Sequence, residues 1–322
     1  MGNLGSLDVL ENGKVSSIRT GHGLPGRMVT ALFEDHTGRI WVGIDEGLWM
    51  YNGKSFTPIL KPDGTHLSLT FNITEDAKDD IWARAVGLFH IHGLKVIEEF
   101  PDDKFPVAQA IYPDPDGSIW LGYRNGSLGR LRNGQLQQYP AIPGMMGNTL
   151  GLLIGPDGWI WGIARTGLFA WREGKSVVLS KRNGLPCEGL FSIQQDNSHT
   201  VWMSTQCGYA SIPFKELEEW RRHPDSVARF RVLGTSDGAQ PGFPTFDPAS
   251  SIAPDGRLWF ANDRVVQMID PSKLQLNQVA PPVHIQQLVA DRKAYAPQNG
   301  LRIPSLSRDI EFDYAGLSFV MP

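Results

Sequence analysis

Tryptophan recurs along this 322-residue chain at a nearly constant interval, each time just after a short polar turn. The recurring residues are Trp41, Trp82, Trp120, Trp161, Trp202 and Trp259. Their spacing is about 40 residues, except for the longer last interval. A few residues after most of them, a glycine is followed by an apolar residue, as at 47–56 and 167–176. Self-similarity at a fixed period indicates a repeat architecture, which constrains the fold more than any other feature of the chain.

Each unit has the pattern of four short strands. In the first complete unit, an apolar segment at 29–33 precedes an Asp/Gly turn, and the tryptophan strand follows. An alternating strand at 48–51 and the hairpin residues Asn52-Gly53 then lead to an outer strand near 55–57. Units of this size with four strands are typical of β-propeller blades, which bury their faces against neighbouring blades. We therefore predict an all-β fold in which the tryptophans pack between blades.

The number of units suggests a seven-bladed type of propeller. Residues 6–18 match the second half of a unit, with Asn12-Gly13 as its hairpin, and six complete units follow. The strands that would complete the half unit are expected upstream of residue 1. Between Trp202 and Trp259, additional residues predict a short helix over 215–222 and a polar loop at 234–248, which decorate a blade. The propeller is predicted to cover 1–279.

A second domain is predicted from residue 280. The repeat pattern stops after 270–273, and Ala280-Pro281-Pro282 is a stiff linker. Residues 283–295 and 309–320 alternate apolar and polar side chains, as in an antiparallel sandwich. About three strands fit into this segment. We predict that 280–322 holds the first strands of an immunoglobulin-like β-sandwich.

Composition excludes several classes of function. The formal net charge is −4 and the pI is about 6.1, so nucleic acid is not an expected partner. The sequence has no apolar run of ~18 residues and no basic, apolar leader, so no membrane contact is expected within this chain. Only Cys187 and Cys207 occur, which excludes a disulfide-rich scaffold and a four-cysteine zinc site.

The units resemble two-component regulator propeller repeats. Residues 21–56, GHGLPGRMVTALFEDHTGRIWVGIDEGLWMYNGKSF, follow that pattern nearly throughout, and 183–212 repeat it. The tail, with PPVHIQQLVAD and a string ending in YAGLSFVMP, resembles the start of a triple-tyrosine domain, the sandwich that follows such propellers. Residues 75–88 depart from the pattern, because they lack the turn glycine and are one residue short after Trp82. That edge of the blade is expected to be reshaped.

The resemblance implies the extracytoplasmic, periplasmic sensor module of a bacterial two-component receptor. The parent protein would carry a membrane helix and an output domain, most often a histidine kinase, outside this chain. The implied partner is an extracellular small molecule or oligosaccharide bound on one propeller face. The sandwich would support a homodimer that passes the signal towards the membrane.

Loops on a rigid scaffold are where binding residues concentrate, so the turns after the tryptophan strands are the candidate site. These turns share one face with the Gly-Leu-Pro loops. Tyr123 beside Arg124 would pair a stacking ring with a guanidinium fork suited to carboxylate or sulfate. The simpler interpretation is that these are solvated turn residues. The candidates are Asp45, Glu46, Arg84, Tyr123, Arg124, Asn125, Arg165, Thr166, Gln206, Asp263 and Arg264.

Other polar residues have structural interpretations. His90 and His92 share one strand face and would be a metal site only with a third ligand nearby. Aspartates in the turns before the tryptophans are interpreted as turn formers, namely Asp114, Asp116, Asp157 and Asp255. Cys187 and Cys207 lie at the same end of one blade, which is compatible with a disulfide and with two reduced side chains.

No catalytic fingerprint is present, and we predict a recognition module that is not an enzyme and needs no cofactor. Two alternatives stay open. A propeller enzyme of the polysaccharide lyase or hydrolase type would need histidines and carboxylates clustered at the axis. A protein–protein platform would present a flat surface in place of a concave polar one.

Overall fold

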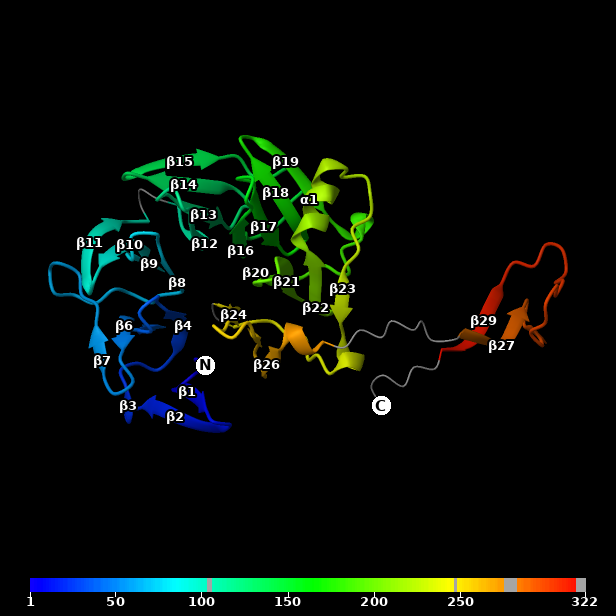
Figure 1. Cartoon of the computed structure of the whole chain (residues 1–322), viewed down its shortest axis with the longest axis horizontal. Coiled ribbons are helices and arrows are strands. Elements are labelled where there is room, and N and C mark those ends of the chain that lie inside the picture. The colour runs from blue at the N-terminus through cyan, green and yellow to red at the C-terminus, as the bar shows by residue number, and fades with distance from the viewer. Residues whose placement is uncertain (103–105, 246–247, 275–282, 317–322) are drawn as a thin grey trace. The chain divides into compact units, whose positions relative to one another are not determined.

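The computed structural model of the chain describes residues 1–102, 106–245, 248–274 and 283–316. It divides into two compact units, Met1–Pro271 and Ser272–Pro322. Within the first unit, small sheets of mostly antiparallel strands follow one another around a central space (Figure 1). The fold is all-β, as predicted.

Five sheets of the described chain have four strands each, connected in sequence order. The first strands of successive sheets, β4, β8, β12, β16 and β20, contact one another in that order. These five sheets comprise β4–β7 (Val29–Glu34, Ile40–Ile44, Gly47–Tyr51, Phe56–Pro58), β8–β11 (Asn72–Glu75, Ile81–Ala85, Gly87–His92, Lys95–Phe100), β12–β15 (Ala108–Pro113, Ile119–Tyr123, Leu128–Arg132, Gln135–Tyr139), β16–β19 (Gly151–Ile154, Ile160–Ala164, Gly167–Arg172, Lys175–Leu179) and β20–β23 (Leu190–Gln195, Thr200–Thr205, Gly208–Pro213, Arg231–Leu233).

Two further sheets of this unit have three strands in the described chain. The first contains the predicted N-terminal hairpin, β1 (Ser6–Glu11) and β2 (Lys14–Thr20), joined by β3 (Gly23–Leu24). Asn12 and Gly13 between them both have positive φ, as a two-residue hairpin turn requires. The second contains β24 (Ser250–Ile252), β25 (Leu258–Ala261) and β26 (Val266–Ile269). A short 3₁₀ helix, Pro271–Lys273, follows β26, at the point where the repeat pattern of the sequence stops.

The predicted insertion helix is present as α1 (Phe214–Arg222). Its buried side chains, Phe214, Leu217 and Trp220, recur at the spacing of one helix face and pack into the core of the adjacent sheets. The outer strand β23 follows the helix and completes the sheet of β20–β22. Two other 3₁₀ turns lie at Lys181–Asn183 and Thr235–Asp237.

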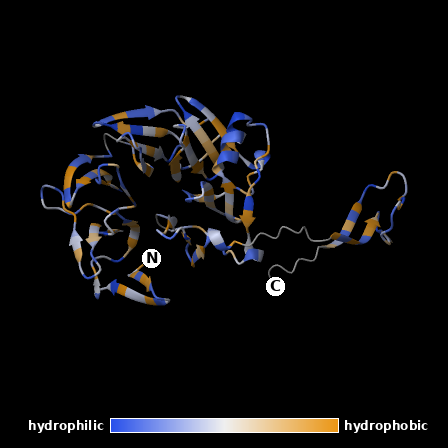
Figure 2. Ribbon diagram, in the orientation of Figure 1, coloured by the Kyte–Doolittle hydropathy of each residue, from blue (hydrophilic) through white to orange (hydrophobic). Residues whose placement is uncertain are grey.

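The recurring tryptophans pack between neighbouring sheets. Trp41 is fully buried and lies in one cluster with Phe89 and Ile91 of the following sheet. Trp161 is likewise buried against Val201 and Ile212. Hydrophobic residues are concentrated along the strands (Figure 2). Burial of such large aromatic surfaces stabilises each blade against the next.

An aspartate six residues before the tryptophan ties the turn to the indole. Asp35 accepts a hydrogen bond from Trp41 Nε1 at 2.8 Å and others from the backbone of its own turn. The same indole bond joins Asp76 to Trp82, Asp114 to Trp120 and Asp196 to Trp202. The turn-forming interpretation of Asp114 therefore covers only part of its role.

The turn of residues 76–80 keeps the shape of the others, contrary to the expected reshaping. Asp79 adopts a φ of 64° in the place of the missing glycine. Its amide donates to Asp76 O, as Gly38 donates to Asp35 O in the first blade. The missing residue shortens the other end of the blade, where only Val86 separates the paired residues Ala85 and Gly87.

The second unit contains three described strands, β27 (Val283–Ala290), β28 (Lys293–Tyr295) and β29 (Ile310–Gly316). They pair antiparallel in the order β28-β27-β29. The expected linker at 280–282 and the end of the expected last strand lie outside the described residues. No helix in the described part of the chain is long and apolar enough to cross a membrane.

Candidate functional site

The turns after the tryptophan strands form one surface, which we call the rim. It consists of Asp45–Glu46, Val86, Tyr123–Ser127, Arg165–Thr166, Gln206–Cys207 and Asn262–Val265. Backbone hydrogen bonds connect these turns to the loops that lead into the blades. Asp45 N donates to Met28 O at 3.2 Å, and Gln206 N donates to Gly189 O at 2.8 Å. Gly189 N in turn donates to Arg165 O of the preceding blade at 2.6 Å, so the rim turns at Arg165 and Gln206 are held together.

Asp45 is a structural residue of the rim. Its Oδ1 accepts hydrogen bonds from the amides of Arg27 and Met28, at 2.9 and 3.2 Å. The carboxylate therefore anchors the Gly-Leu-Pro loop of its own blade. Glu46, the next residue, is exposed and free to face a ligand.

Arg84 lies within strand β9 and not in a rim turn. Its guanidinium carbon is 4.8 Å from the centre of the Phe71 ring. Because this blade is one residue short, the residue at the tip of its turn is Val86, which is 62% exposed. The prediction that Arg84 belongs to the turn was wrong for this reason.

Tyr123 is buried, so it does not form the predicted exposed stacking pair with Arg124. Only 4% of the residue is accessible, and its ring packs against Gly129 on the neighbouring strand. Burial raises the pKa of the Tyr123 phenol to about 12. The ring supports the floor of the rim, whereas Arg124 is exposed on it.

Most of the other candidates face solvent. Thr166 is half-buried, and its hydroxyl oxygen accepts a hydrogen bond from Met146 N at 3.1 Å. Asn125 Oδ1 accepts two hydrogen bonds from Ser127, which fixes the turn beside Arg124. The exposed candidates are Glu46, Arg124, Asn125, Arg165, Gln206, Asp263 and Arg264.

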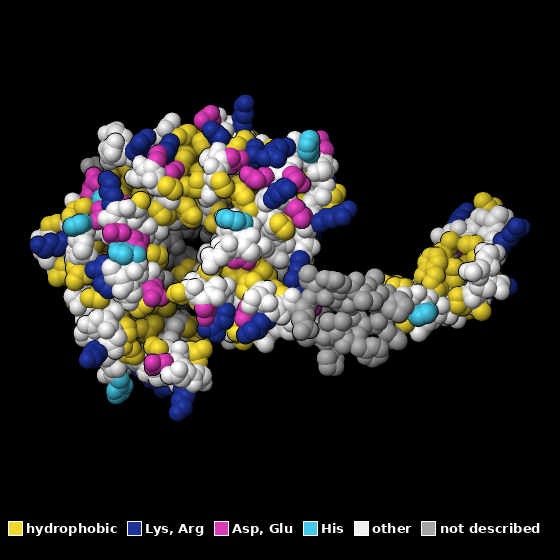
Figure 3. Space-filling view, viewed as in Figure 1, with side chains coloured by type: hydrophobic (Ala, Val, Ile, Leu, Met, Phe, Trp, Pro, Cys, Tyr) yellow, Lys and Arg dark blue, Asp and Glu magenta, His cyan; other side chains and the backbone are white. Residues whose placement is uncertain are grey.

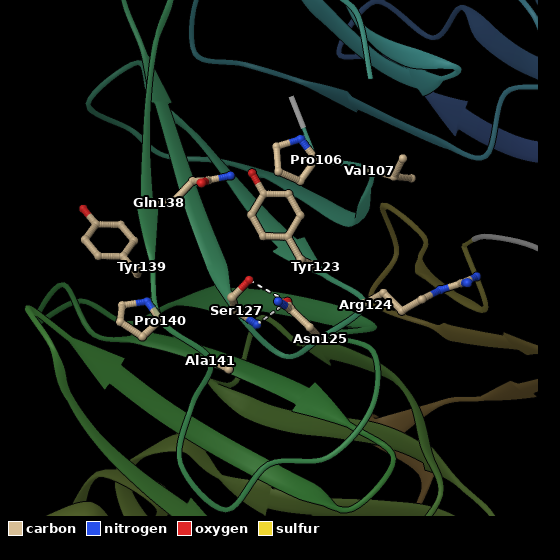
Figure 4. Close-up of a pocket in the computed structure, with 10 residues that line it drawn as sticks. All are labelled: Pro106, Val107, Tyr123, Arg124, Asn125, Ser127, Gln138, Tyr139, Pro140 and Ala141. Atoms are coloured by element: carbon tan, nitrogen blue, oxygen red, sulfur yellow. Dashed lines mark hydrogen bonds between the residues drawn. The ribbon is translucent and has the colours of Figure 1, made fainter. Parts of the chain in front are cut away.

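An open cleft of about 660 Å³ lies beside the turn 123–127. Figure 4 shows the Tyr123 ring between Pro106 and Gln138, while Arg124 points away from Tyr139. The walls combine aromatic and proline surface with amide and hydroxyl groups. Such a lining suits a ligand that combines flat ring surfaces, which pack on the tyrosines and prolines, with polar groups that hydrogen-bond to the amides and hydroxyls.

A second patch on the rim involves a residue that sequence reasoning missed. Phe243, from the insertion loop, is 54% exposed and packs on Phe191 with ring centres 5.0 Å apart. The Arg165 guanidinium lies 5.9 Å from the centre of the Phe243 ring. The amide of Asp263 donates to Phe243 O, which holds the loop on the rim. The only available signal was an aromatic residue inside a polar insertion.

Cys187 and Cys207 form a disulfide, with Cα atoms 6.3 Å apart. It links the loop before β20 to the rim turn after β21, so it braces the rim at Gln206. Thr205 Oγ1 lies 3.2 Å from Cys187 Sγ.

Replacing both cysteines by serine is expected to lower the free energy of unfolding by about 2 kcal/mol, because the unfolded chain regains loop entropy. Chemical denaturation of the variant and of the oxidised parent measures the difference. The parent under reducing conditions is the control and should lose the same amount. An unchanged midpoint in both cases would contradict a bracing role.

His90 and His92 lie on one face of β10, as predicted, and a carboxylate lies between them. Asp80 Oδ2 is 2.9 Å from His90 Nε2, and Asp80 Oδ1 is 2.6 Å from His92 Nδ1. These residues belong to the end of the blade opposite to the rim, because the turn 76–80 joins the first two strands and the rim turns follow the second. The sequence did not reveal a third metal-binding group near the two histidines, and the Asp80 carboxylate is such a group.

The fold defines a protein of the β-propeller class, and comparisons with known proteins agree. The family described as two component regulator propeller matches residues 23–46. No curated protein matches the sequence.

Solved structures are similar over nearly the whole chain. The extracellular domain of the hybrid two component system BT3049 from B. thetaiotaomicron has a TM-score of 0.73 and 21% identity, and the similarity covers 97% of this chain and 41% of that chain. The extracellular domain of BT4673 from the same organism has a TM-score of 0.61 and 16% identity, covering 95% and 43%. Streptogramin B lyase has a TM-score of 0.59 and 18% identity, covering 82% and 86%. The chain thus spans less than half the length of the two extracellular domains.

Proposed function

We propose that this chain is the extracytoplasmic sensor module of a bacterial two-component receptor. The observation that carries the proposal is the likeness to extracellular domains of such systems over 95% or more of the chain. The match of residues 23–46 to the two component regulator propeller supports the same assignment. The parent protein would hold the output domain, and this chain would supply recognition without catalysis.

We propose further that the ligand is a carbohydrate-like molecule with an acidic group, bound on the rim. The cleft beside Tyr123 offers a mixed polar and aromatic lining, as sugar faces and hydroxyls require. Arg124 and Arg165 extend from adjacent blades and are both exposed. A guanidinium fork binds a carboxylate or sulfate through two parallel hydrogen bonds.

Residues from 280 onwards would begin the triple-tyrosine sandwich, through which two copies of the receptor would associate. The support is the alternation of β27 and β29, which leaves Val283, Ile285, Phe312 and Tyr314 exposed for further strands. Ligand binding on the propeller would then change the geometry of the dimer.

A thermal-shift screen against neutral and acidic oligosaccharides tests the proposed ligand. A ligand at 100 times its dissociation constant adds ~2.7 kcal/mol, or roughly 5 °C in melting temperature for a chain of this size. We expect an acidic oligosaccharide to give such a shift, and we expect Arg124→Ala and Arg165→Ala each to reduce it by more than half.

The matched control is Arg132→Ala. Arg132 is also an exposed arginine, but it lies at the opposite end of β14 from Arg124. A shift that Arg132→Ala abolishes and Arg124→Ala leaves intact would place the ligand on the other face. Analysis of the oligosaccharide after incubation separates sensing from a lyase or hydrolase activity, because a sensor returns it intact. If none of the sugars raises the melting temperature, a protein partner is favoured.

A further inference from the structure

Asp80 lies between two imidazoles and forms, with Asp76 and His90, one of two groups in the described chain whose potential metal-ligand atoms lie within 4.8 Å of one another. In the pairing of β9 with β10, His90 lies opposite Trp82 and Ile91 opposite Ile81. His92 is therefore directly across from Asp80, which precedes β9, and His90 is on the same face two residues away. The side chain of Asp80 is only 9% exposed.

The two carboxylate oxygens of Asp80 have imidazole nitrogens as their hydrogen-bond partners. Oδ2 faces His90 Nε2 at 2.9 Å, and Oδ1 faces His92 Nδ1 at 2.6 Å. The neighbouring Asp76 differs, because its oxygens accept from Lys78 N, Asp80 N and the indole of Trp82. The Asp76 side chain thus serves the turn, whereas Asp80 contributes its backbone to the turn and directs its carboxylate to the imidazoles.

The His90 ring is fixed in position. It stacks on Trp82 with ring centres 4.1 Å apart and an angle of 11° between the planes. Its second nitrogen, Nδ1, faces Glu98 Oε2 of strand β11 at 3.8 Å. At this distance Glu98 places a negative charge near the ring without a hydrogen bond to Nδ1.

No other described blade places these groups together. The residues equivalent to His90, which lie opposite the tryptophans, are Met50, Arg130, Ala170, Ser211 and Met268. Arg130 lies over the Trp120 ring as His90 lies over Trp82, so stacking alone does not require an imidazole. Repeat structure therefore does not account for two histidines facing Asp80.

We propose that Asp80, His90 and His92 bind a divalent transition-metal ion, specifically Zn²⁺. Two imidazole nitrogens and one carboxylate oxygen are the ligand types that this borderline ion prefers. Zn–N and Zn–O bonds are about 2.0–2.2 Å long, so the His92 ring has to turn from Asp80 Oδ1 towards an ion held by His90 and Asp80. His92 is 73% exposed and supplies the adjustable ligand, while His90 and Asp80 form the fixed part. Water would complete the coordination.

A second cluster beside the same turn supplies an internal control. His36 Nδ1 lies 2.6 Å from Glu75 Oε1 and 3.5 Å from Asp79 Oδ1. Glu75 Oε2 also accepts from the backbone amide of His36 at 2.8 Å, so this carboxylate is already used to join two blades. Asp79 is 68% exposed. Figure 3 shows histidine and acidic side chains next to one another over the region of β8 to β11.

The test is isothermal titration of the full chain with Zn²⁺ in a buffer that does not bind metal, after removal of bound metal by a chelator. We expect one Zn²⁺ per chain, with an affinity that His92→Gln and His90→Gln each lower by more than about 10-fold. Because His92 is exposed, His92→Gln should melt at the parent temperature without metal, which excludes unfolding as the cause. His36→Gln should bind Zn²⁺ as the parent does, and Mg²⁺ should not compete, because it prefers an oxygen shell.

Equal Zn²⁺ affinity in the parent and in the His90 and His92 variants would overturn the proposal. So would a loss of binding in His36→Gln alone, which would assign the ion to the other cluster. No heat of binding up to millimolar Zn²⁺ would also overturn it.

Discussion

Asp35→Asn is expected to lower the free energy of unfolding by about 2–4 kcal/mol, although the change replaces one atom. The Asp35 carboxylate accepts hydrogen bonds from the backbone amides of Thr37 and Arg39, from their side chains, and from the buried indole of Trp41. An asparagine has one acceptor oxygen, and its amide group would face donors. Urea denaturation followed by tryptophan fluorescence measures the loss.

The same contacts predict how stability depends on pH. Burial alone would raise the pKa of Asp35, but hydrogen bonds from Thr37, Trp41 and Arg39 outweigh it and hold the pKa well below its ordinary value. A lowered pKa in the folded state contributes stability above the unfolded-state pKa, and this contribution is lost as the pH falls through the folded-state value. The stability of the parent should therefore decrease below about pH 4, and Asp35→Asn should flatten that decrease.

Two variants in the blade of Trp259 serve as matched controls. Ala253 occupies the position of Asp35 there and makes the same turn hydrogen bonds with Arg257 and Gly256. Ala253→Asp is expected to add about 1 kcal/mol by supplying the missing indole bond. Asp255→Asn, in the same turn, removes only exposed contacts with Arg257. If Asp35→Asn lowers the free energy of unfolding no more than Asp255→Asn does, the hydrogen bond between Asp35 and the Trp41 indole does not stabilise the fold.

Gly208→Ala is expected to destabilise the protein by on the order of 3 kcal/mol or more. Gly208 has a φ of 132°, and an added Cβ would lie 2.1 Å from the carbonyl oxygen of Leu233 on the outer strand. That oxygen belongs to the backbone of a paired strand, so it cannot move without breaking the pairing of β22 with β23. Gly47 and Gly87 meet backbone carbonyls in the same way, which explains the recurring Gly-apolar pair in the sequence.

Gly53→Ala separates the two causes of this effect. Gly53 also has a positive φ, 89°, but its added Cβ would meet nothing within 4 Å. It should cost about 1 kcal/mol, from backbone conformation alone. Thermal unfolding of both variants gives the comparison, and similar losses for Gly53→Ala and Gly208→Ala would refute the steric explanation.

The strands and their order could be predicted from the sequence because each blade repeats the same local signals. The tryptophan, the Asp/Gly turn and the Asn-Gly hairpin act within a few residues, so one unit explains the others. Where a signal changed, as at 76–80, the chain kept the turn by giving Asp79 the glycine conformation. Local sequence alone does not reveal that an aspartate will accept such a conformation.

The rim was predicted as a surface, but the roles of its residues were not, because side-chain roles there depend on contacts between segments. The Asp45 carboxylate accepts hydrogen bonds from the amides of Arg27 and Met28, which lie 18 and 17 residues earlier in the chain. Tyr123 turns inward because Gly129 on the next strand leaves room for its ring. Phe243 reaches the rim from an insertion whose path the repeat pattern does not describe.

Hydrogen–deuterium exchange on the chain with an acidic oligosaccharide that raises its melting temperature, compared with the free chain, tests most directly whether the rim is the recognition face. The account predicts slower exchange at the turns 123–127 and 165–166 and at the loop around Phe243. It predicts no change at 35–39 and 114–118, the turns at the opposite ends of the blades. Protection confined to those opposite turns, with the rim unaffected, would contradict it.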